Sequence, residues 1–435
     1  MSAKLRVTTL GCKVNQYETE LVRQGLQRVG FEDCADDERA DVCIVNTCTV
    51  TSQGDAKSRQ VIRRMARDNP DARIVVMGCY ATRAPEDVAQ LPGVAEVVTD
   101  KRELPDLMSR FGVVDVPTGL DGFSGRQRAY VKVQDGCLLR CSYCIIPHVR
   151  PELTSRPLDH IVEEVCRLTT AGHREVVLTG IHLGHYGVDW NRNKPREEWT
   201  RLADLVRQLC KLPGDFRIRL SSIEATEVTR SLIDVMAEYP ARIVPHVHLC
   251  LQSGSDSVLR RMRRRWGTRM FLDRCRLLGE VLNKPAITTD IIAGFPGETE
   301  SEFEQTLETC RAAGFSKIHA FPFSARRGTP AADMPNQLSG DLKNRRIHRL
   351  GELESELRRE YFETLVGEPV QVMVESRSEL ASLDRGGSIE RLFRGTTCRY
   401  APAEWVGDDP SVKTGDLVDA TVIESNGHRL LVGQV

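Results

Sequence analysis

Three cysteines, Cys137, Cys141 and Cys144, lie close together in a C-x3-C-x2-C pattern, which is the most informative feature of the sequence. Three thiolates at this spacing on one loop can bind three irons of a 4Fe-4S cluster and leave the fourth iron open to a small-molecule ligand. Zinc sites usually consist of paired C-x2-C units, or of Cys and His sets that fill the fourth position. Only one C-x2-C unit occurs here, so the spacing favours an iron–sulfur cluster over zinc.

Three further cysteines are predicted to meet at one edge of an N-terminal sheet. Apolar runs alternate with helical segments in this region, which is typical of an open, mostly parallel α/β sheet. The expected strands are Leu5–Leu10, Val42–Asn46 and Ile74–Met77, and the expected helices are Tyr17–Val29, Asp55–Arg67 and Pro85–Gln90. Cys12, Cys48 and Cys79 each follow one of these strands, where open α/β sheets build their sites. They are candidates for a second three-thiolate cluster; the alternative is that they are buried packing thiols.

The central part of the chain predicts a parallel barrel or partial barrel of six β/α units, with its site at the carboxyl ends of the strands. The loop of Cys137 follows the first of these strands, as that architecture requires. The expected strands are Ala129–Gln134, Glu175–Thr179, Ile218–Ser221, Val247–Leu251, Ile287–Ile292 and Lys317–Phe321. His182, His185 and His248 lack the spacing of a zinc site and are interpreted as loop or core residues, with His182 close to the predicted cofactor.

The C-terminal part changes to the period-two alternation of β-strands, as in Val370, Val372 and Val374. Turn glycines separate these runs, and together they predict a small antiparallel β barrel or sheet. The glycines are Gly367, Gly386, Gly387, Gly415 and Gly427.

A basic run from Arg260 to Trp266 is a candidate RNA surface. On a helix it would cover more than one face, and Trp266 could stack on a base. The alternative is a solvated helix. Further arginines before and along the following helix could add phosphate contacts. They are Arg326, Arg327, Arg345, Arg346 and Arg349.

Composition limits the class of protein. The length of 435 residues suggests about three domains, and the formal net charge of -1 does not by itself indicate a polyanionic partner. No apolar run approaches the ~20 residues of a membrane helix and the N-terminus lacks a signal-peptide core, so we expect a cytoplasmic protein. Fourteen cysteines in such a chain argue for thiolate ligands rather than disulfides. The cysteines without a ligand role are expected to be mostly buried small hydrophobic residues.

The loop of Cys137, with Tyr143 directly before its last cysteine, resembles the signature loop of radical S-adenosylmethionine enzymes. The resemblance implies that the open iron chelates S-adenosylmethionine, whose reductive cleavage yields a 5′-deoxyadenosyl radical, and that the three cysteines are catalytic. Later strand ends match the same family in the same order. The residues that the resemblance places at the cofactor are Tyr143, Gly180, His182, Ser221, Glu224, Gln252, Ile292 and Gly294.

The segments Thr9–Glu18, Asn46–Val50 and Met77–Cys79 resemble the N-terminal domain of methylthiotransferases. In that family Cys12, Cys48 and Cys79 would bind an auxiliary 4Fe-4S cluster that carries the sulfur to be methylated and inserted. The C-terminal region resembles the OB-like, RNA-binding TRAM domain. The resemblance therefore implies three domains, at residues 2–115, 123–358 and 361–435.

The resemblance further implies conversion of a C–H bond to C–SCH3 with two 4Fe-4S clusters and two S-adenosylmethionine molecules per turnover. The motifs around Cys12, Cys48 and Gly180 look most like the branch that modifies N6-threonylcarbamoyladenosine at position 37 of tRNA. Residues 151–154 depart from that branch, which usually continues with Gly and a basic stretch after Arg150.

The expected partners are the tRNA anticodon loop, a low-potential electron donor and a sulfur donor, with no membrane. Two alternatives within the enzyme class are action on isopentenyladenosine in tRNA and on an aspartate of a ribosomal protein. An alternative of another class is a non-catalytic RNA-binding iron–sulfur protein.

Overall fold

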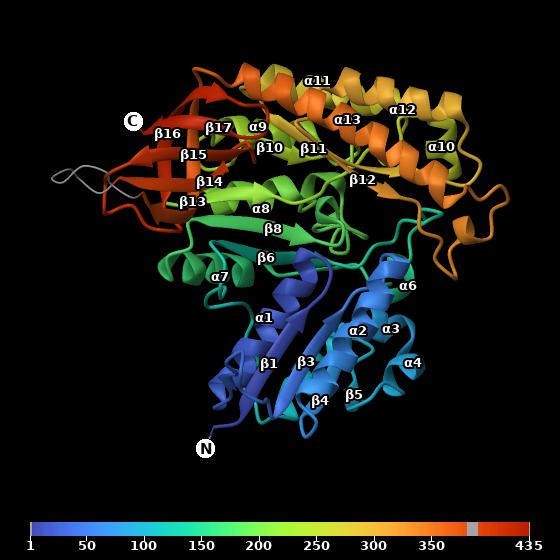
Figure 1. The fold of residues 1–435 in the computed structure, drawn as a ribbon, viewed down its shortest axis with the longest axis vertical. Coiled ribbons are helices and arrows are strands. Elements are labelled where there is room, and N and C mark those ends of the chain that lie inside the picture. Colours follow the sequence, from blue (N-terminus) through green and yellow to red (C-terminus); the bar gives the residue numbers. More distant parts are fainter. Residues whose placement is uncertain (1, 381–389, 435) are drawn as a thin grey trace.

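A parallel five-stranded sheet with the order β2-β1-β3-β4-β5 forms the N-terminal unit of the computed structural model, which describes residues 2–380 and 390–434 (Figure 1). Its strands are β1 (Lys4–Thr9), β2 (Glu32–Asp33), β3 (Val42–Thr47), β4 (Arg73–Gly78) and β5 (Val94–Val97). Its helices are α1 (Lys13–Arg28), α2 (Ser52–Asp68), α3 (Cys79–Arg83), α4 (Pro85–Ala89) and α5 (Leu104–Ser109), with the 3-10 turn η1 (Lys101–Glu103). The predicted open parallel α/β sheet is confirmed.

Helices cover both faces of this sheet, which explains why its central strands are apolar throughout. In β3, Val42 and Ile44 pack with α1 and α5, whereas Cys43 and Val45 pack with α2, α3 and α4 on the opposite face. Successive side chains of a strand point to opposite faces, so a strand buried on both sides has no polar alternation.

Six parallel strands form the central unit, in the sheets β7-β6-β8-β9 and β10-β11-β12. They are β6 (Arg128–Asp135), β8 (Glu175–Gly180), β9 (Arg217–Leu220), β10 (His246–His248), β11 (Ala286–Ala293) and β12 (Lys317–Pro322); the short β7 (Thr154–Ser155) is antiparallel to β6. Parallel bridges from Ile218 to Ile243 and from Ile223 to Leu249 connect the two sheets. Among the described residues no pairing joins β12 back to β6. The predicted partial barrel is confirmed.

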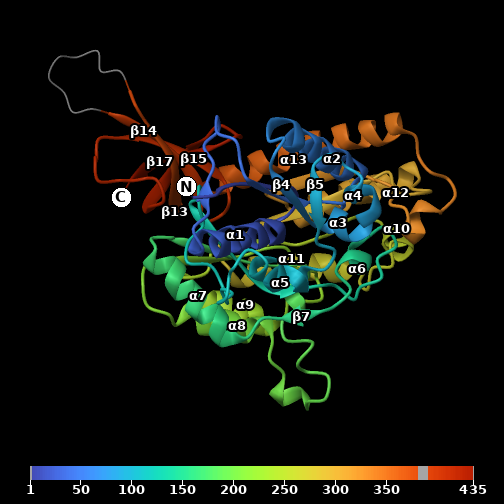
Figure 2. The same ribbon diagram turned by 90° about the horizontal axis from the view of Figure 1, so that it is seen from below.

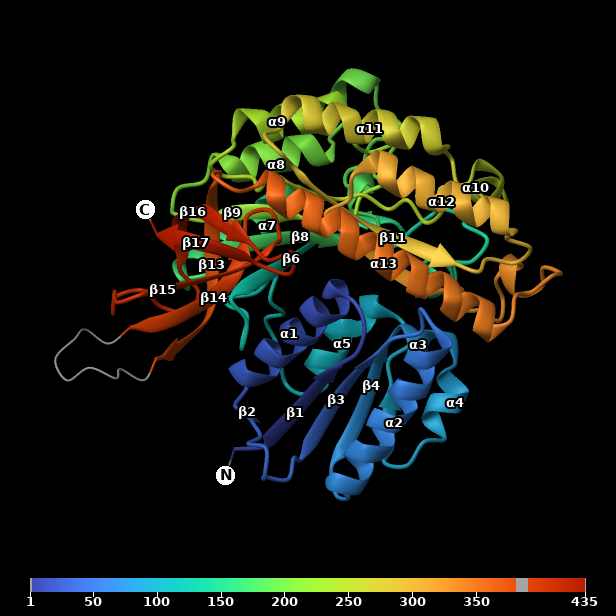
Figure 3. The ribbon, with the colours of Figure 1, turned by 45° about the horizontal axis from the view of Figure 1, so that its top comes forward.

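Helices lie on the outer side of this partial barrel (Figure 3). They are α7 (Leu158–Thr170), α8 (Leu202–Cys210), α9 (Arg230–Glu238), α10 (Asp256–Arg261), α11 (Thr268–Val281), α12 (Glu300–Ala313) and α13 (Gly340–Thr364). The short α6 (Ile146–Val149) instead follows the cysteine loop and lies against α3 of the N-terminal unit (Figure 1). Short 3-10 turns are η2 (Leu183–His185), η3 (Arg196–Glu198) and η4 (Pro330–Ala332). The segment that connects β8 to α8 projects away from the body of the chain (Figure 2). In residues 2–380 and 390–434, no helix is long and apolar enough to cross a membrane.

The C-terminal unit is a closed five-stranded barrel with the order β13-β14-β15-β17-β16, at one end of the molecule (Figures 1 and 2). Its strands are β13 (Pro369–Glu379), β14 (Arg391–Thr397), β15 (Pro402–Gly407), β16 (Leu417–Ser425) and β17 (Leu430–Gln434). The pairs are antiparallel except β15 with β17. This confirms the predicted small β module; the turn expected at Gly386–Gly387 lies outside the described residues.

Buried arginines dock this barrel on the central unit. Glu175, at the start of β8, accepts hydrogen bonds from Arg217 and Arg219 of β9 and lies 2.8 Å from Nε of Arg128. Arg217 and Arg219 also donate to carbonyls of Gln371 and Thr397 in the barrel. The buried Glu175 thus lies at the centre of one polar part of the interface, to which the ion pairs Arg128–Glu375 and Lys284–Glu368 and the apolar packing of Val244 against the barrel core also contribute.

Candidate functional site

The strands of the N-terminal sheet end toward the central unit, so that two sets of strand-end loops face each other (Figure 1). Cys12 is the residue before α1, Cys48 directly follows β3, and Cys79 begins α3 directly after β4. Gly11 has a φ of 102° and lies close to Cys48, since a Cβ at position 11 would be only 3.2 Å from the Cys48 Sγ. The absence of a side chain at Gly11 therefore allows the loops of Cys12 and Cys48 to approach each other. The structure thus places the three N-terminal cysteines at one sheet edge.

Two of the three N-terminal thiols, Cys12 and Cys48, have a raised pKa. Burial raises the pKa of Cys12, and burial raises the pKa of Cys48 to about 11; in both cases the nearby Cys79 adds to the increase. Bringing thiolates together in a buried site is unfavourable unless a metal replaces the protons. This donor set therefore fits an iron–sulfur cluster.

The loop of the central cysteines runs from β6 to α6 and is held by backbone contacts. Gly136 has a φ of 75°, and a Cβ at this position would lie 1.7 Å from the carbonyl oxygen of Glu152, so only glycine fits. The Cys137 amide donates to the carbonyl of Arg150, at 3.2 Å, and the Cys144 amide donates to that of Cys141, at 3.1 Å. These contacts curl the loop so that its thiols share one space.

Two of the three central thiols, Cys141 and Cys144, also have a raised pKa. Burial raises the pKa of Cys141, and burial raises that of Cys144 to about 12, with Cys137 adding to both increases. The cationic side chain of Arg264 lies 3.5 Å from Sγ of Cys141 and lowers the cost of a thiolate there. The donor set again fits a cluster bound through three thiolates.

Three of the residues predicted at the cofactor, Tyr143, Gln252 and Ile292, line one cavity of about 310 Å³ together with the predicted cluster ligand Cys144. The cavity is also lined by Val50 and Thr51 of the N-terminal unit, so it lies between the two facing sets of loops. Gln252 has a φ of 68°, which is rare for a residue other than glycine. Its amide donates to Asp290 and its carbonyl accepts from the Ile292 amide, which fixes this strained strand end.

The remaining predicted residues lie around the cysteine loop or behind it, not on this cavity. His182 Nδ1 lies 3.5 Å from Sγ of Cys137, and Glu224 forms an ion pair of 2.7 Å with Arg264. The buried Ser221 hydroxyl has no partner among the described residues, as expected of a group that awaits a ligand.

The two predicted glycines are tightly enclosed. A Cβ on Gly180 would lie 2.9 Å from the Gln134 side chain, and one on Gly294 would lie 2.4 Å from Lys343. The Gly294 amide donates to Glu298. Close packing of this kind explains why small residues are needed at both positions.

Several functional candidates were not found by sequence reasoning. His182, His185 and Glu227 have ligand atoms within 4.8 Å of one another, and so do His248, Cys250 and Asp290. The histidines were interpreted as loop or core residues because no suitable partner lay near them in sequence. The carboxylates come from other parts of the barrel, Asp290 from within β11 and Glu227 from the segment after β9, and only the fold brings them close to the histidines.

The prediction of a basic helix that ends in a base-stacking tryptophan is wrong. Helix α10 ends at Arg261, and Arg263 adopts a left-handed φ of 58°, so the run turns back on itself. Arg264 is buried beside Cys141, and Trp266 is only 5% exposed and packs on Phe271. Arg260, Arg263 and Arg265 stay on the surface.

The further arginines predicted to contact phosphates are also partly buried and partly exposed. Arg326 and Arg346 are buried in ion pairs with Asp55 and Glu298, whereas Arg327 and Arg345 are exposed. The exposed cations alone are available to a polyanion.

Comparison with known proteins finds family models that match both of the units that carry the facing loops. A family model described as uncharacterized protein family UPF0004 matches residues 4–100, and the radical SAM superfamily model matches residues 131–310. The chain is 38% identical to the threonylcarbamoyladenosine tRNA methylthiotransferase MtaB of Bacillus subtilis, which covers 96% of this chain and 93% of the relative. It is 33% identical to a tRNA-2-methylthio-N(6)-dimethylallyladenosine synthase of Sorangium cellulosum, over 98% of this chain and 92% of that relative.

Among solved structures, the fold resembles the radical S-adenosylmethionine methyltransferase TsrM from Kitasatospora setae. The TM-score is 0.56 at 15% identity, over 76% of this chain and 77% of that one. A likeness at this level of identity describes the architecture alone.

Proposed function

The chain belongs to the radical S-adenosylmethionine methylthiotransferase family, and we propose that it converts N6-threonylcarbamoyladenosine at position 37 of tRNA to its 2-methylthio derivative. The observation that carries this proposal is the pair of facing cysteine sets, Cys12, Cys48 and Cys79 on one sheet and Cys137, Cys141 and Cys144 on the other. The family makes the chain an enzyme, which excludes the alternative of a non-catalytic RNA-binding protein.

Each cysteine set would hold one 4Fe-4S cluster through three thiolates and leave one iron open. When bound, the cluster at Cys137 together with S-adenosylmethionine supplies a 5′-deoxyadenosyl radical, and the cluster at Cys12 supplies the sulfur, with a second S-adenosylmethionine as the methyl source. The chain's own contribution is positioning: it holds two reactive centres around one carbon.

The residues around the central cysteines prepare the binding site of S-adenosylmethionine. Tyr143, Gln252 and Ile292 line the cavity, and the Ser221 hydroxyl, which has no partner among the described residues, is available to a polar group of the cofactor. Arg264 holds its charge against Cys141 and stabilises the thiolate form of this ligand.

The cavity also sets where the substrate base must enter. Its walls come from both units, with Val50 and Thr51 on one side and Phe321 and Phe323 on the other. Phe321 is 47% exposed, so an aromatic face is available at the rim. An adenine splayed out of an anticodon loop could stack there, as single-stranded bases do on aromatic side chains.

The tRNA would bind to the C-terminal barrel and the exposed arginines, and the reaction would draw electrons from a low-potential donor and sulfur from a separate donor. The relative from Sorangium cellulosum supports a second candidate substrate, dimethylallyladenosine (isopentenyladenosine) in tRNA. The relatives named for threonylcarbamoyladenosine include the one at 38% identity, which favours that branch.

Nucleoside analysis of tRNA tests this assignment. Total tRNA from a deletion strain and from its complemented counterpart is hydrolysed and analysed by mass spectrometry. We expect 2-methylthio-N6-threonylcarbamoyladenosine to disappear and its unthiolated precursor to accumulate. Loss of only the 2-methylthio-isopentenyl nucleoside would transfer the function to the second candidate, and an unchanged nucleoside profile would contradict both.

A further inference from the structure

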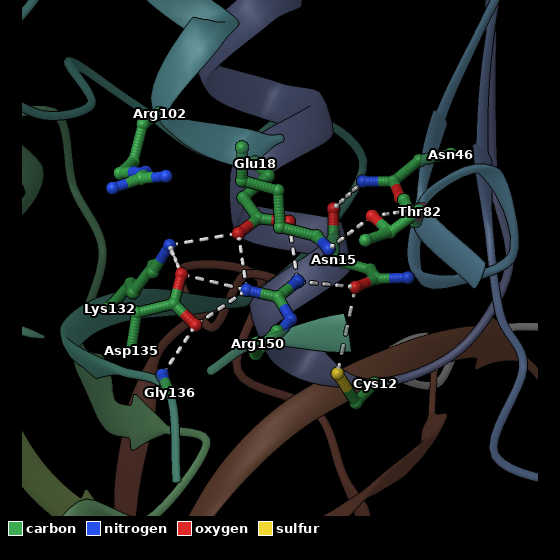
Figure 4. A network of polar contacts seen from close by, with 12 residues as sticks. Cys12, Asn15, Glu18, Asn46, Thr82, Arg102, Lys132, Asp135, Gly136 and Arg150 are labelled. Atoms are coloured by element: carbon green, nitrogen blue, oxygen red, sulfur yellow. Dashed lines mark hydrogen bonds and ion pairs between the residues drawn. The ribbon is translucent and has the colours of Figure 1, made fainter. Parts of the chain in front are cut away.

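Arg150, a buried arginine of the central unit, forms hydrogen bonds with α1, the first helix of the N-terminal unit (Figure 4). Both terminal nitrogens of Arg150 donate to the carboxylate of Glu18, each at 2.8 Å, and Nη2 also donates to Oδ1 of Asn15 at 3.0 Å. The Arg150 side chain is 2% exposed. Lys132 donates to the same Glu18, and Asp135 accepts from both Arg150 and Lys132, so every charge in the cluster is matched.

This network connects the two cysteine sets through short steps. The Cys137 amide donates to the Arg150 carbonyl, and the Arg150 side chain donates to Asn15. Asn15 in turn donates to the carbonyl of Thr47, at 3.0 Å, and accepts a long contact from the thiol of Cys12, at 3.9 Å. Arg150 is thus tied by its backbone to one cluster loop and by its side chain to the other.

A second buried arginine, Arg326, also connects the central unit to the N-terminal unit, from the segment that follows β12. Arg326 Nη2 donates to Oδ2 of Asp55 at 2.6 Å and to Oγ1 of Thr49 at 2.9 Å. Thr49 follows Cys48 directly, and Asp55 lies in the first turn of α2. The Arg326 side chain is 4% exposed. The two arginines therefore reach the loops of Cys12 and Cys48 separately, from different parts of the partial barrel.

We propose that Arg150 and Arg326 form a two-point clamp that fixes the Cys12 and Cys48 loops in place opposite the Cys137 loop, and so sets the separation of the two reactive centres. They are positioning residues, and this role rests on the proposed function. The Arg150 guanidinium is bidentate to Glu18, which fixes orientation as well as distance, whereas Arg326 contacts both Asp55 and Thr49 through Nη2. A lysine keeps the charge at either position but cannot make these paired contacts. Glu18 and Asp55 retain ion pairs with Lys132 and Arg83, so the replacements are expected to let the facing loops fluctuate rather than to leave a carboxylate unpaired.

The test uses the full chain with Arg150→Lys, Arg326→Lys and the double replacement. Glu18→Gln breaks the first contact from the partner's side and guards against a folding defect specific to Arg150. Arg242→Lys is the matched control, because Arg242 donates to carbonyls of Leu212, Gly214 and Phe216, all within the central unit.

The first readout is hydrogen–deuterium exchange of the cluster-free and the reconstituted protein. We expect peptides that cover residues 13–20 in Arg150→Lys and Glu18→Gln, and peptides that cover residues 49–55 in Arg326→Lys, to exchange about tenfold faster than wild type, since hydrogen bonds between charged groups are lost. The second readout is the yield of methylthiolated nucleoside per 5′-deoxyadenosine at full iron content. This ratio is expected to fall at least about tenfold in the double variant, because displacement of about 1 Å can cost a hundredfold. Arg242→Lys is expected to change neither readout.

Wild-type exchange and a wild-type ratio in the double variant would overturn the clamp. If the wild-type protein itself yields no methylthiolated nucleoside, the proposed function fails, and hydrogen exchange alone then decides whether Arg150 and Arg326 fix the loops.

Discussion

Glu175 is the residue whose replacement should most clearly separate the C-terminal barrel from the central unit. Its carboxylate is completely buried and lies within 2.6–2.8 Å of guanidinium nitrogens of Arg217, Arg219 and Arg128. Burial opposes the charge, but the surrounding arginines outweigh it and hold the pKa of Glu175 far below its usual range. We therefore consider the replacement Glu175→Gln, which keeps the shape and removes the charge.

The expected loss of stability in Glu175→Gln follows from the three arginines that remain around position 175. Two arginines that are almost completely buried and a third that is 18% exposed would keep their charges without the carboxylate. Removing one partner of a buried ion pair typically costs about 3–5 kcal/mol. Because every 1.4 kcal/mol is about tenfold, the equilibrium for docking the barrel would weaken by a factor of roughly 10² to several times 10³. The matched control Glu404→Gln breaks ion pairs with the partly exposed Arg394 and Arg429 and should cost about 1 kcal/mol or less.

Urea denaturation followed by hydrogen exchange in residues 369–380 and 390–434 measures this effect. We expect Glu175→Gln to release the barrel at a lower urea concentration than the rest of the chain. A carboxylate with a depressed pKa stabilises the fold above its unfolded pKa of about 4.3, and this contribution is lost as the pH falls through the folded pKa. The difference between wild type and variant should therefore be constant from about pH 5 to 8 and shrink in stronger acid. If Glu175→Gln and Glu404→Gln lower the stability of the barrel equally at neutral pH, the proposed role of the buried Glu175 carboxylate is refuted.

Three further predictions concern the cysteine sets and the RNA surface. Replacing Cys137, Cys141 and Cys144 with Ala should leave about four irons per chain and abolish 5′-deoxyadenosine formation, as measured by iron analysis and chromatography. Replacing Cys12, Cys48 and Cys79 should also leave about four irons but preserve this cleavage while stopping sulfur insertion; an unchanged iron content would contradict the auxiliary site. Replacing the exposed Arg260, Arg263 and Arg265 with Gln should weaken tRNA binding and flatten its dependence on log salt by roughly one per lost phosphate contact, in filter-binding assays at several salt concentrations. An unchanged salt dependence would mean that these arginines only face solvent and do not contact tRNA. Replacement of the buried Arg264 should leave the salt dependence of tRNA binding unchanged.

Much of the architecture could be predicted because buried parallel strands are recognisable as apolar runs. Strands β1, β3 and β4 begin and end within one residue of the expected positions, and parallel topology alone then predicts that Cys12, Cys48 and Cys79 share a sheet edge. The pattern is clearest for β3 and β4, which contain the apolar runs Val42–Val45 and Ile74–Met77, and weaker for β1, where Lys4 and Arg6 alternate with Leu5 and Val7.

The interface between the units could not be predicted in this way. Arg150 and Glu18 are 132 residues apart, and Arg326 and Asp55 are 271 residues apart, so no local pattern indicates their pairing. The basic run was misread for a related reason. Its arginines favour a solvated helix locally, but the left-handed turn at Arg263 is stabilised by burying Trp266 in the core, a tertiary effect. Local propensity is often overridden when a large aromatic side chain can be buried.

The most direct test of the central claim is a reaction of the purified protein with both clusters reconstituted. The substrate is tRNA that carries unthiolated N6-threonylcarbamoyladenosine, supplied with a strong reductant, a sulfide source and S-adenosylmethionine labelled with a trideuteromethyl group. We predict a 2-methylthio nucleoside that contains the intact labelled methyl group, together with 5′-deoxyadenosine. Formation of 5′-deoxyadenosine without any labelled methylthio nucleoside on threonylcarbamoyladenosine or isopentenyladenosine tRNA would contradict the claim that this chain is a tRNA methylthiotransferase.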